Sequence, residues 1–249
     1  MQLLGRKKRN WKLIIIGIIL LLNGCAKSVA DKNNDLGNGD KSNLPISLDL
    51  LIEHAEYCKE IYDSGGDQKD EVAFEVKQDN ETTTIVIRGT ANAENVQSDI
   101  DVRLVNDDKL GIYLHKGFRD ASVSVMSSID DGHTIKNTVY ITGHSLGGAV
   151  AQIIGMWFHK RGHNVQIFSY GSPKVSNQVL SGGQPTHWRV VRRSDPIPFT
   201  PPWPYHHTGL FINSQTLDWG PDNDNGLISK TDGLDHAIVK YVTTLKEQL

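Results

Sequence analysis

Residues 139–152 constrain the fold of this chain more than any other stretch. A β-branched, apolar run is followed by Gly143, Ser145 and Gly147, and then by apolar residues at helical spacing. A Gly-x-Ser-x-Gly pattern between a strand and a helix is typical of a nucleophile elbow, a sharp turn that lifts a serine hydroxyl clear of the backbone. Glycines suit the two flanking positions because such a turn leaves no room for Cβ atoms. The stretch therefore predicts Ser145 as a nucleophile, with an ordinary turn of a parallel sheet as the alternative.

The first 24 residues have the features of an export signal. Five basic side chains lie within residues 6–12, and an apolar run follows at 13–22. These are signal-peptide proportions, and the run is too short to span a bilayer. Leu22-Asn23-Gly24-Cys25 resembles a bacterial lipobox, in which the cysteine is diacylated and becomes the mature N-terminus, although Asn23 departs from the usual pattern. We expect a lipoprotein-type signal peptide at 1–24, with an uncleaved anchor or a plain secretory signal as alternatives.

The remaining chain is acidic. Without residues 1–24 it has 21 basic against 29 acidic side chains, a net charge near −8 with histidine neutral. This argues against nucleic acid or an anionic membrane surface as a partner. Membrane attachment would come from acyl chains on Cys25, which predicts a lipid-anchored protein of the bacterial cell envelope, or a secreted one if the lipobox is not used. Cys58 is the other cysteine, and its apolar surroundings predict a buried free thiol.

Residues 25–45 are polar, so we expect a flexible tether before one folded domain at 46–249. Apolar spacing predicts a helix at 47–62, capped by Ser47 and ended by Gly65, and strands and helices that alternate after it. The chain is therefore expected to be of the α/β class, with a mostly parallel central sheet and helices on both faces. The expected strands are 72–78, 82–88, about 100–105, the run before Ser145, 165–170 and 187–193; the later helices run to about 129, after Ser145, and over 237–245.

A serine nucleophile needs a base, and the base needs an acid that orients it. In the fold that uses this elbow, the acid precedes the histidine in the sequence. Asp195 lies just past a predicted strand end, where parallel sheets place catalytic groups, but a turn residue paired with Arg192 or Arg193 is an equal interpretation. His207 and His236 are close rivals for the base, because both follow Asp195 and His236 lies on a loop entering the last helix.

The chain resembles the class 3 lipases, the fungal-type triacylglycerol lipase family, over about residues 48–241. Eight short motifs occur in the family's order: residues 55–58, 87–90, 115–118, the elbow at 143–148, 170–175, 195–198 with Pro201-Pro202, 205–209 and 234–236. The resemblance implies an α/β-hydrolase fold. It also implies that Ser145 is the nucleophile, Asp195 the acid and His236 the base.

The same resemblance implies roles for the neighbouring residues. The oxyanion donors would be the backbone N–H of Leu146 and Thr90, through its backbone N–H and its hydroxyl. His207 would be the family's second, structural histidine. His144, the variable residue of the elbow, is expected to pack or to form hydrogen bonds rather than to act as a second base.

One stretch departs from the family. There, the segment after the oxyanion residue carries an apolar lid, whereas residues 91–99 here contain Val96 as the one sizeable apolar side chain. A lid exposes an apolar face to lipid when it opens, so we expect little interfacial activation and a preference for smaller or more soluble esters. Trp203 is expected to line the acyl site or to pack in the core.

The predicted function is serine-dependent hydrolysis of carboxylic esters, acyl glycerides or phospholipids. The alternatives are a small-ester esterase, a phospholipase, or a catalytically inert envelope lipoprotein that keeps the fold as a binding module. No cofactor is needed for this chemistry, and we expect no metal, because the spacing of Asp218, Asp222 and Asp224 does not match a calcium loop. We expect a monomer.

Overall fold

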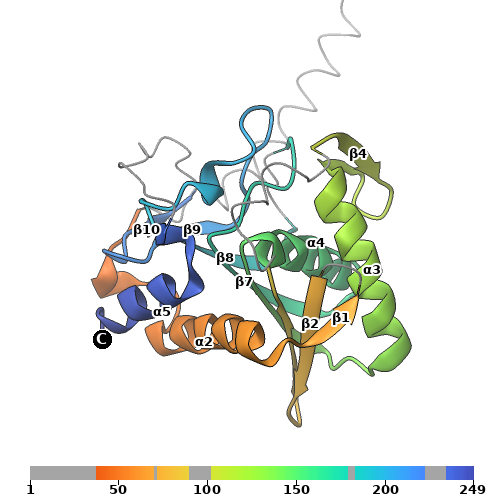
Figure 1. The fold of residues 1–249 in the computed structure, drawn as a ribbon, viewed down its shortest axis with the longest axis horizontal. Helices are drawn as coiled ribbons and strands as arrows, with labels where there is room; N and C mark the ends of the chain where they lie inside the picture. Colours follow the sequence, from red (N-terminus) through yellow and green to blue (C-terminus); the bar gives the residue numbers. More distant parts are fainter. Residues whose placement is uncertain (1–37, 70–71, 90–101, 179–182, 222–233) are drawn as a thin grey trace, which may run out of the picture.

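The fold is built around one large, mostly parallel β-sheet (Figure 1). The computed structural model describes residues 38–69, 72–89, 102–178, 183–221 and 234–249. Among these residues the sheet has eight strands in the order β1-β2-β3-β6-β7-β8-β9-β10. Strands β3, β6, β7, β8 and β9 are parallel, while β1, β2 and β10 join antiparallel at the edges. Their bounds are β1 Asp67–Lys69, β2 Val72–Gln78, β3 Thr82–Ile87, β6 Thr138–His144, β7 Asn164–Tyr170, β8 Thr186–Val191, β9 Leu210–Asn213 and β10 Trp219–Gly220.

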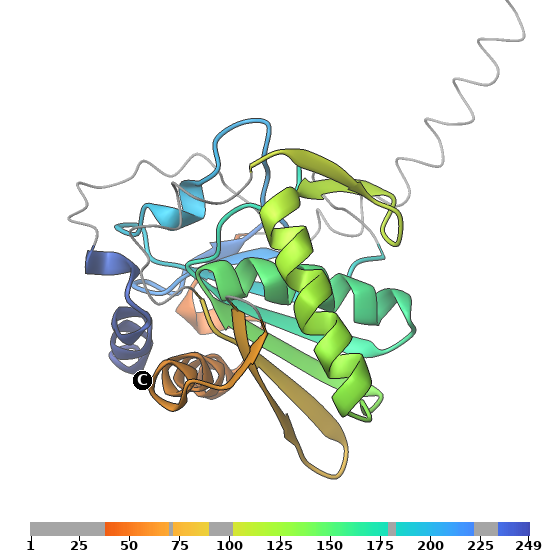
Figure 2. The ribbon, with the colours of Figure 1, turned by 45° about the vertical axis from the view of Figure 1, so that its right-hand side comes forward.

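Helices cover both faces of the sheet, as predicted (Figure 2). On one face lie α3 (Lys116–Gly132) and α4 (Leu146–Lys160), whose apolar side chains pack on β3, β6 and β7. On the other lie α2 (Leu48–Ser64) and α5 (Ile238–Lys246), which pack against each other and the sheet. Because α4 starts directly at the end of β6, Ser145 lies at the carboxyl edge of the sheet, between the two helical layers.

Several short elements differ from the prediction. Strands β4 (Leu104–Asp107) and β5 (Ile112–His115) form a separate antiparallel pair, and β5 leads directly into α3 at Lys116. Strands β9 and β10 were not predicted, since runs of four and two residues are too short to show a period. Short 3-10 turns occupy η1 (Lys41–Asn43), η3 (Ile197–Phe199) and η4 (Leu234–His236).

Three local predictions concern helix α2: its N-cap, its last residue and the thiol of Cys58. Ser47 occupies the N-cap position, but its side chain makes no cap hydrogen bond, so the predicted cap is wrong. Gly65 ends the helix as predicted, with a φ of 86° that favours glycine. Cys58 is a buried free thiol, also as predicted, and burial raises the pKa of this thiol to about 12.

The expected signal peptide at 1–24 and Cys25 lie outside the described residues. The described part of the expected tether, residues 38–45, contacts the domain, because Gly39 pairs with Trp219 through two backbone hydrogen bonds of 2.9 Å. In the described part of the chain, no helix is both long enough and apolar enough to cross a bilayer.

Four buried histidines make the stability of this fold sensitive to acid. Burial lowers the pKa of His54 and of His187 to about 3, and lowers those of His144 and His207 well below the ordinary value of 6.5. Below pH 6.5 these residues bind protons in the unfolded chain and not in the folded chain. Their contribution to the free energy of unfolding is therefore fully present above pH 6.5 and is lost as the pH falls. Each of these histidines is expected to lower the free energy of unfolding by about 1.4 kcal/mol for each pH unit below 6.5.

His54→Phe tests this expectation. The ring of His54 stacks on Phe168 with 3.7 Å between centroids, and its Nδ1 has no hydrogen-bond partner among the described residues, so a phenyl ring can keep the stacking contact. Urea unfolding between pH 6 and pH 4 is expected to show a slope against pH that is smaller by about 1.4 kcal/mol per unit in the variant. Equal slopes in the two proteins would show that His54 does not resist protonation.

Candidate active site

The elbow holds Ser145 in a strained backbone conformation at the N-cap of α4. Its φ of 58° and ψ of −130° are unusual for a residue with a side chain, and such strain is typical of functional positions. A Cβ on Gly143 would lie 2.2 Å from the carbonyl oxygen of Gly147, and a Cβ on Gly147 would lie 2.2 Å from that of Ile87. Both glycines are therefore required for β6, α4 and β3 to approach as closely as they do.

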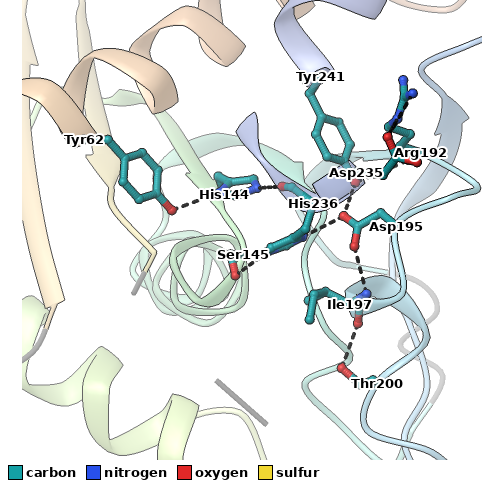
Figure 3. Close-up of polar contacts among 10 residues, drawn as sticks. All are labelled: Tyr62, His144, Ser145, Arg192, Asp195, Ile197, Thr200, Asp235, His236 and Tyr241. Carbon is teal, nitrogen blue, oxygen red and sulfur yellow. Dashed lines mark hydrogen bonds and ion pairs between the residues drawn. The ribbon is translucent and has the colours of Figure 1, made fainter. Parts of the chain in front are cut away.

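Ser145, His236 and Asp195 form one chain of hydrogen bonds (Figure 3). The Nε2 atom of His236 lies 2.7 Å from the Ser145 Oγ, and its Nδ1 lies 2.7 Å from the Asp195 Oδ2. A carboxylate accepts only, so Nδ1 carries the proton and Nε2 accepts from the serine hydroxyl. His236 is 3% exposed, and the other two side chains are fully buried. This geometry lets the imidazole take the serine proton.

Asp195 is held by three donors. One oxygen, Oδ1, accepts from the backbone N–H of Ile197 at 2.9 Å. The other, Oδ2, accepts from the Tyr241 hydroxyl at 2.5 Å as well as from His236. Arg192 pairs instead with Asp235 at 3.2 Å, which contradicts its alternative pairing with Asp195. The guanidinium of Arg193 lies over the ring of Phe211, so the alternative pairing with this arginine is wrong too.

Two residues at this acid were not predicted from sequence. Tyr241 comes from the buried face of α5, and burial raises the pKa of its phenol, so it remains a donor. Gly171 follows β7 with a φ of 58°, and a Cβ there would lie 2.7 Å from the Asp195 Oδ2 and 3.2 Å from the His236 Cε1. A tyrosine on an otherwise apolar helix face was the available signal, because a buried hydroxyl needs a partner.

The remaining histidines lie in other surroundings. His207 is buried, and its Nε2 lies 2.5 Å from the carbonyl oxygen of Pro198, a contact that ties it to the loop after Asp195. His187 bonds Ser169 within the sheet. Among the described histidines that follow Ser145, His236 alone has a hydrogen bond to it.

The predicted oxyanion donors are described in part. Thr90 and residues 91–99 lie outside the described residues, but Gly89 is described, and a Cβ on it would lie 3.0 Å from that of Ser145. The backbone just after β3 therefore lies close to Ser145. Leu146 is the first residue of α4, where an N–H has no acceptor within its own helix. The oxyanion roles of both residues stay predictions.

Trp203 is 84% exposed, so its interpretation as a core residue is wrong. Its role at an acyl site stays a prediction. In the described residues no group of three or more His, Cys, Asp or Glu side chains is arranged to hold a metal ion. Asp222 and Asp224 lie outside the described residues.

Comparison with known proteins relates this geometry to a family. A family model described as lipase (class 3) matches residues 84–205. The chain is 31% identical over 170 residues to a secreted mono- and diacylglycerol lipase of Fusarium solani, covering 62% of this chain and 50% of that protein. It is 27% identical over 197 residues to a lipase of Rhizomucor miehei, covering 70% and 53%. The chain thus spans about half the length of these relatives.

The solved structures agree on the fold. A triacylglycerol lipase from Penicillium expansum matches with a TM-score of 0.56 at 16% identity, over 79% of this chain and 95% of that one. The prediction of an α/β-hydrolase fold is thereby confirmed. The family model and the relatives thus show that this chain is similar to class 3 lipases over part of its length.

Proposed function

From this similarity and the geometry of the site, we propose that this chain is a serine hydrolase that cleaves carboxylic esters of lipids through an acyl-enzyme. The observation that carries the proposal is the continuous hydrogen-bond chain from Asp195 through His236 to Ser145, placed on a strained elbow. Buried charges and dipoles act on one another more strongly than in water, so a buried triad suits this chemistry.

The reaction follows from the direction of each hydrogen bond. Ser145 Oγ attacks the ester carbonyl carbon while its proton passes to His236 Nε2, and the carbonyl oxygen becomes an oxyanion. The backbone N–H of Leu146 and the donors of Thr90 would bind that oxyanion. The tetrahedral intermediate then breaks its bond to the alcohol, which leaves with the proton from His236. Water repeats the cycle and releases the carboxylic acid.

Asp195 has an electrostatic task in this cycle. Its carboxylate accepts a hydrogen bond from the Nδ1–H of His236. This bond keeps Nε2 free to accept from Ser145 and stabilises the imidazolium that forms. The hydroxyl of Tyr241 and the N–H of Ile197 fix the two carboxylate oxygens in place.

A fluorophosphonate probe tests the proposal. Such a probe traps an activated serine covalently, so peptide mass spectrometry is expected to find the adduct on Ser145, with ester hydrolysis lost in proportion to labelling. The purified wild-type protein should also release acid from nitrophenyl esters. An unlabelled, inactive protein would favour the inert binding module.

The substrate class is proposed on the residues around the site. The relatives are named as lipases and as a mono- and diacylglycerol lipase, which supports acyl glycerides. The scarcity of apolar side chains in residues 91–99 supports smaller or more soluble esters. A series of acyl chain lengths and head groups, including phospholipids, separates a lipase from an esterase and a phospholipase.

The cellular location is a separate proposal. The lipobox-like sequence ending at Cys25 supports a protein held in the bacterial envelope by acyl chains, with release outside the cell as the alternative. The intact mass of the mature protein distinguishes them, because a diacylated N-terminal cysteine is heavier than a free one.

A further inference from the structure

His144 has both ring nitrogens engaged, although the reaction above gives it no task. It lies between Gly143 and Ser145 in the elbow and is buried. Its Nδ1 lies 2.9 Å from the hydroxyl of Tyr62, and its Nε2 lies 2.7 Å from the backbone carbonyl oxygen of His236 (Figure 3). The ring therefore connects helix α2 to the peptide of the proposed base.

The chemistry of the partners fixes the direction of these bonds. A carbonyl oxygen only accepts, so the Nε2 of His144 must carry a proton. A neutral imidazole has one N–H, so its Nδ1 accepts, and the Tyr62 hydroxyl donates to it. The Tyr62 oxygen also lies close to Gly89, because a Cβ built there would be 2.6 Å from it. Two hydrogen bonds thus run from Tyr62, through His144, to the carbonyl of His236.

The neutral state of His144 matters because of its neighbour. The centroids of the His144 and His236 rings are 4.6 Å apart, and among the described residues the rings of Tyr62 and Tyr241 also lie against His144, at 5.8 Å and 6.0 Å. Burial and the charge of His236 lower the pKa of His144. A neutral ring there adds no positive charge beside the imidazolium that His236 becomes during the reaction.

The Tyr62 phenol occupies a gap beside Gly89. A Cβ on Gly89 would lie 2.6 Å from the Tyr62 hydroxyl and 2.7 Å from the His144 carbonyl oxygen. Helix α2 therefore delivers the phenol into a gap that only a glycine at position 89 leaves open. Gly89 immediately precedes Thr90, the proposed oxyanion residue, and the same phenol bonds His144, the residue before Ser145.

We propose that Tyr62 and His144 are positioning residues, which hold the peptide of His236 at one end and the β3 end before Thr90 at the other. This rests on the proposed function. Neither side chain is expected to touch the ester. Their effect is to keep His236 Nε2 within reach of the Ser145 hydroxyl, and an error of about 1 Å in such a distance costs on the order of a hundredfold in rate.

Three variants test the proposal by steady-state kinetics on a soluble nitrophenyl ester, with active sites counted by the phosphonate probe. Tyr62→Phe removes one oxygen and is expected to lower kcat about tenfold with KM within about twofold. His144→Leu removes both bonds and is expected to lower kcat roughly a hundredfold. His144→Gln has an oxygen for Tyr62 and an N–H for the carbonyl, so it should keep kcat within about threefold of wild type.

Tyr57→Phe is the matched control. Tyr57 lies on the same helix, and its hydroxyl bonds Glu53, away from the site, so this variant should have wild-type kcat. Equal kcat in Tyr62→Phe and wild type overturns the positioning role and leaves the proposed function standing. An equally low kcat in His144→Gln and His144→Leu also overturns the positioning role, because hydrogen bonding would then not restore the rate. A wild-type protein that neither labels nor hydrolyses overturns both.

Discussion

Ser145→Ala is expected to lower kcat for ester hydrolysis by about 10⁴-fold or more, the largest effect of any single substitution in this chain. The variant loses one oxygen, the atom that attacks the carbonyl and accepts the acyl group. Backbone geometry should persist, since alanine keeps the Cβ and the Ser145 N–H still donates to the Tyr170 carbonyl at 3.0 Å. Burst and steady-state release of nitrophenol measure the loss, and phosphonate labelling should disappear with it.

Ser122→Ala is the matched control for that result. Ser122 is also fully buried, but it lies in α3 and its hydroxyl bonds the Phe118 carbonyl at 2.7 Å. Its removal should leave kcat unchanged while the thermal midpoint falls slightly. If Ser145→Ala kept wild-type kcat, the hydrolysis would come from another group or a contaminant, and the triad assignment would be wrong.

The elbow around Ser145 could be predicted from sequence because most of its requirements are local. The strand, the two glycines and the first turn of α4 lie within residues 139–152, and part of their geometry depends on that stretch alone, as where Gly143 faces Gly147. The order of strands and helices was equally readable, since buried strands and amphipathic helices each have a period. Short elements such as β9 and β10 carry no such period.

The histidine that bonds Ser145 could not be chosen from sequence spacing, and the reason is physical. His207 and His236 both follow Asp195, and what separates them is the path of the chain after β9, which brings η4 back to the elbow. The contacts of Tyr241 with Asp195 and of Tyr62 with His144 likewise join residues 46 and 82 positions apart. Residues 222–233, between β10 and η4, lie outside the described structure.

Asp195→Asn is the second large prediction, with kcat expected to fall by about 10³- to 10⁴-fold. An amide has one oxygen where the carboxylate has two, and all three donors around Asp195 need an acceptor. If the amide oxygen accepts the fixed N–H of Ile197, its NH₂ group faces His236 Nδ1. That nitrogen must then become an acceptor, which moves the proton to Nε2 and blocks transfer from Ser145. The opposite flip directs NH₂ at the Ile197 N–H, which leaves two donors opposed in a buried space.

Steady-state kinetics on Asp195→Asn distinguish a wrong tautomer of His236 from unfolding of the protein. The kcat per phosphonate-reactive site should drop while KM stays near wild type, because the substitution does not alter the substrate-binding surface. Asp107→Asn is the control: Asp107 is fully buried and accepts from Trp157 and Leu110, far from the triad, so it should change stability without changing kcat. A normal kcat in Asp195→Asn would mean that His236 keeps its tautomer without the carboxylate, and another group would then have to orient the base.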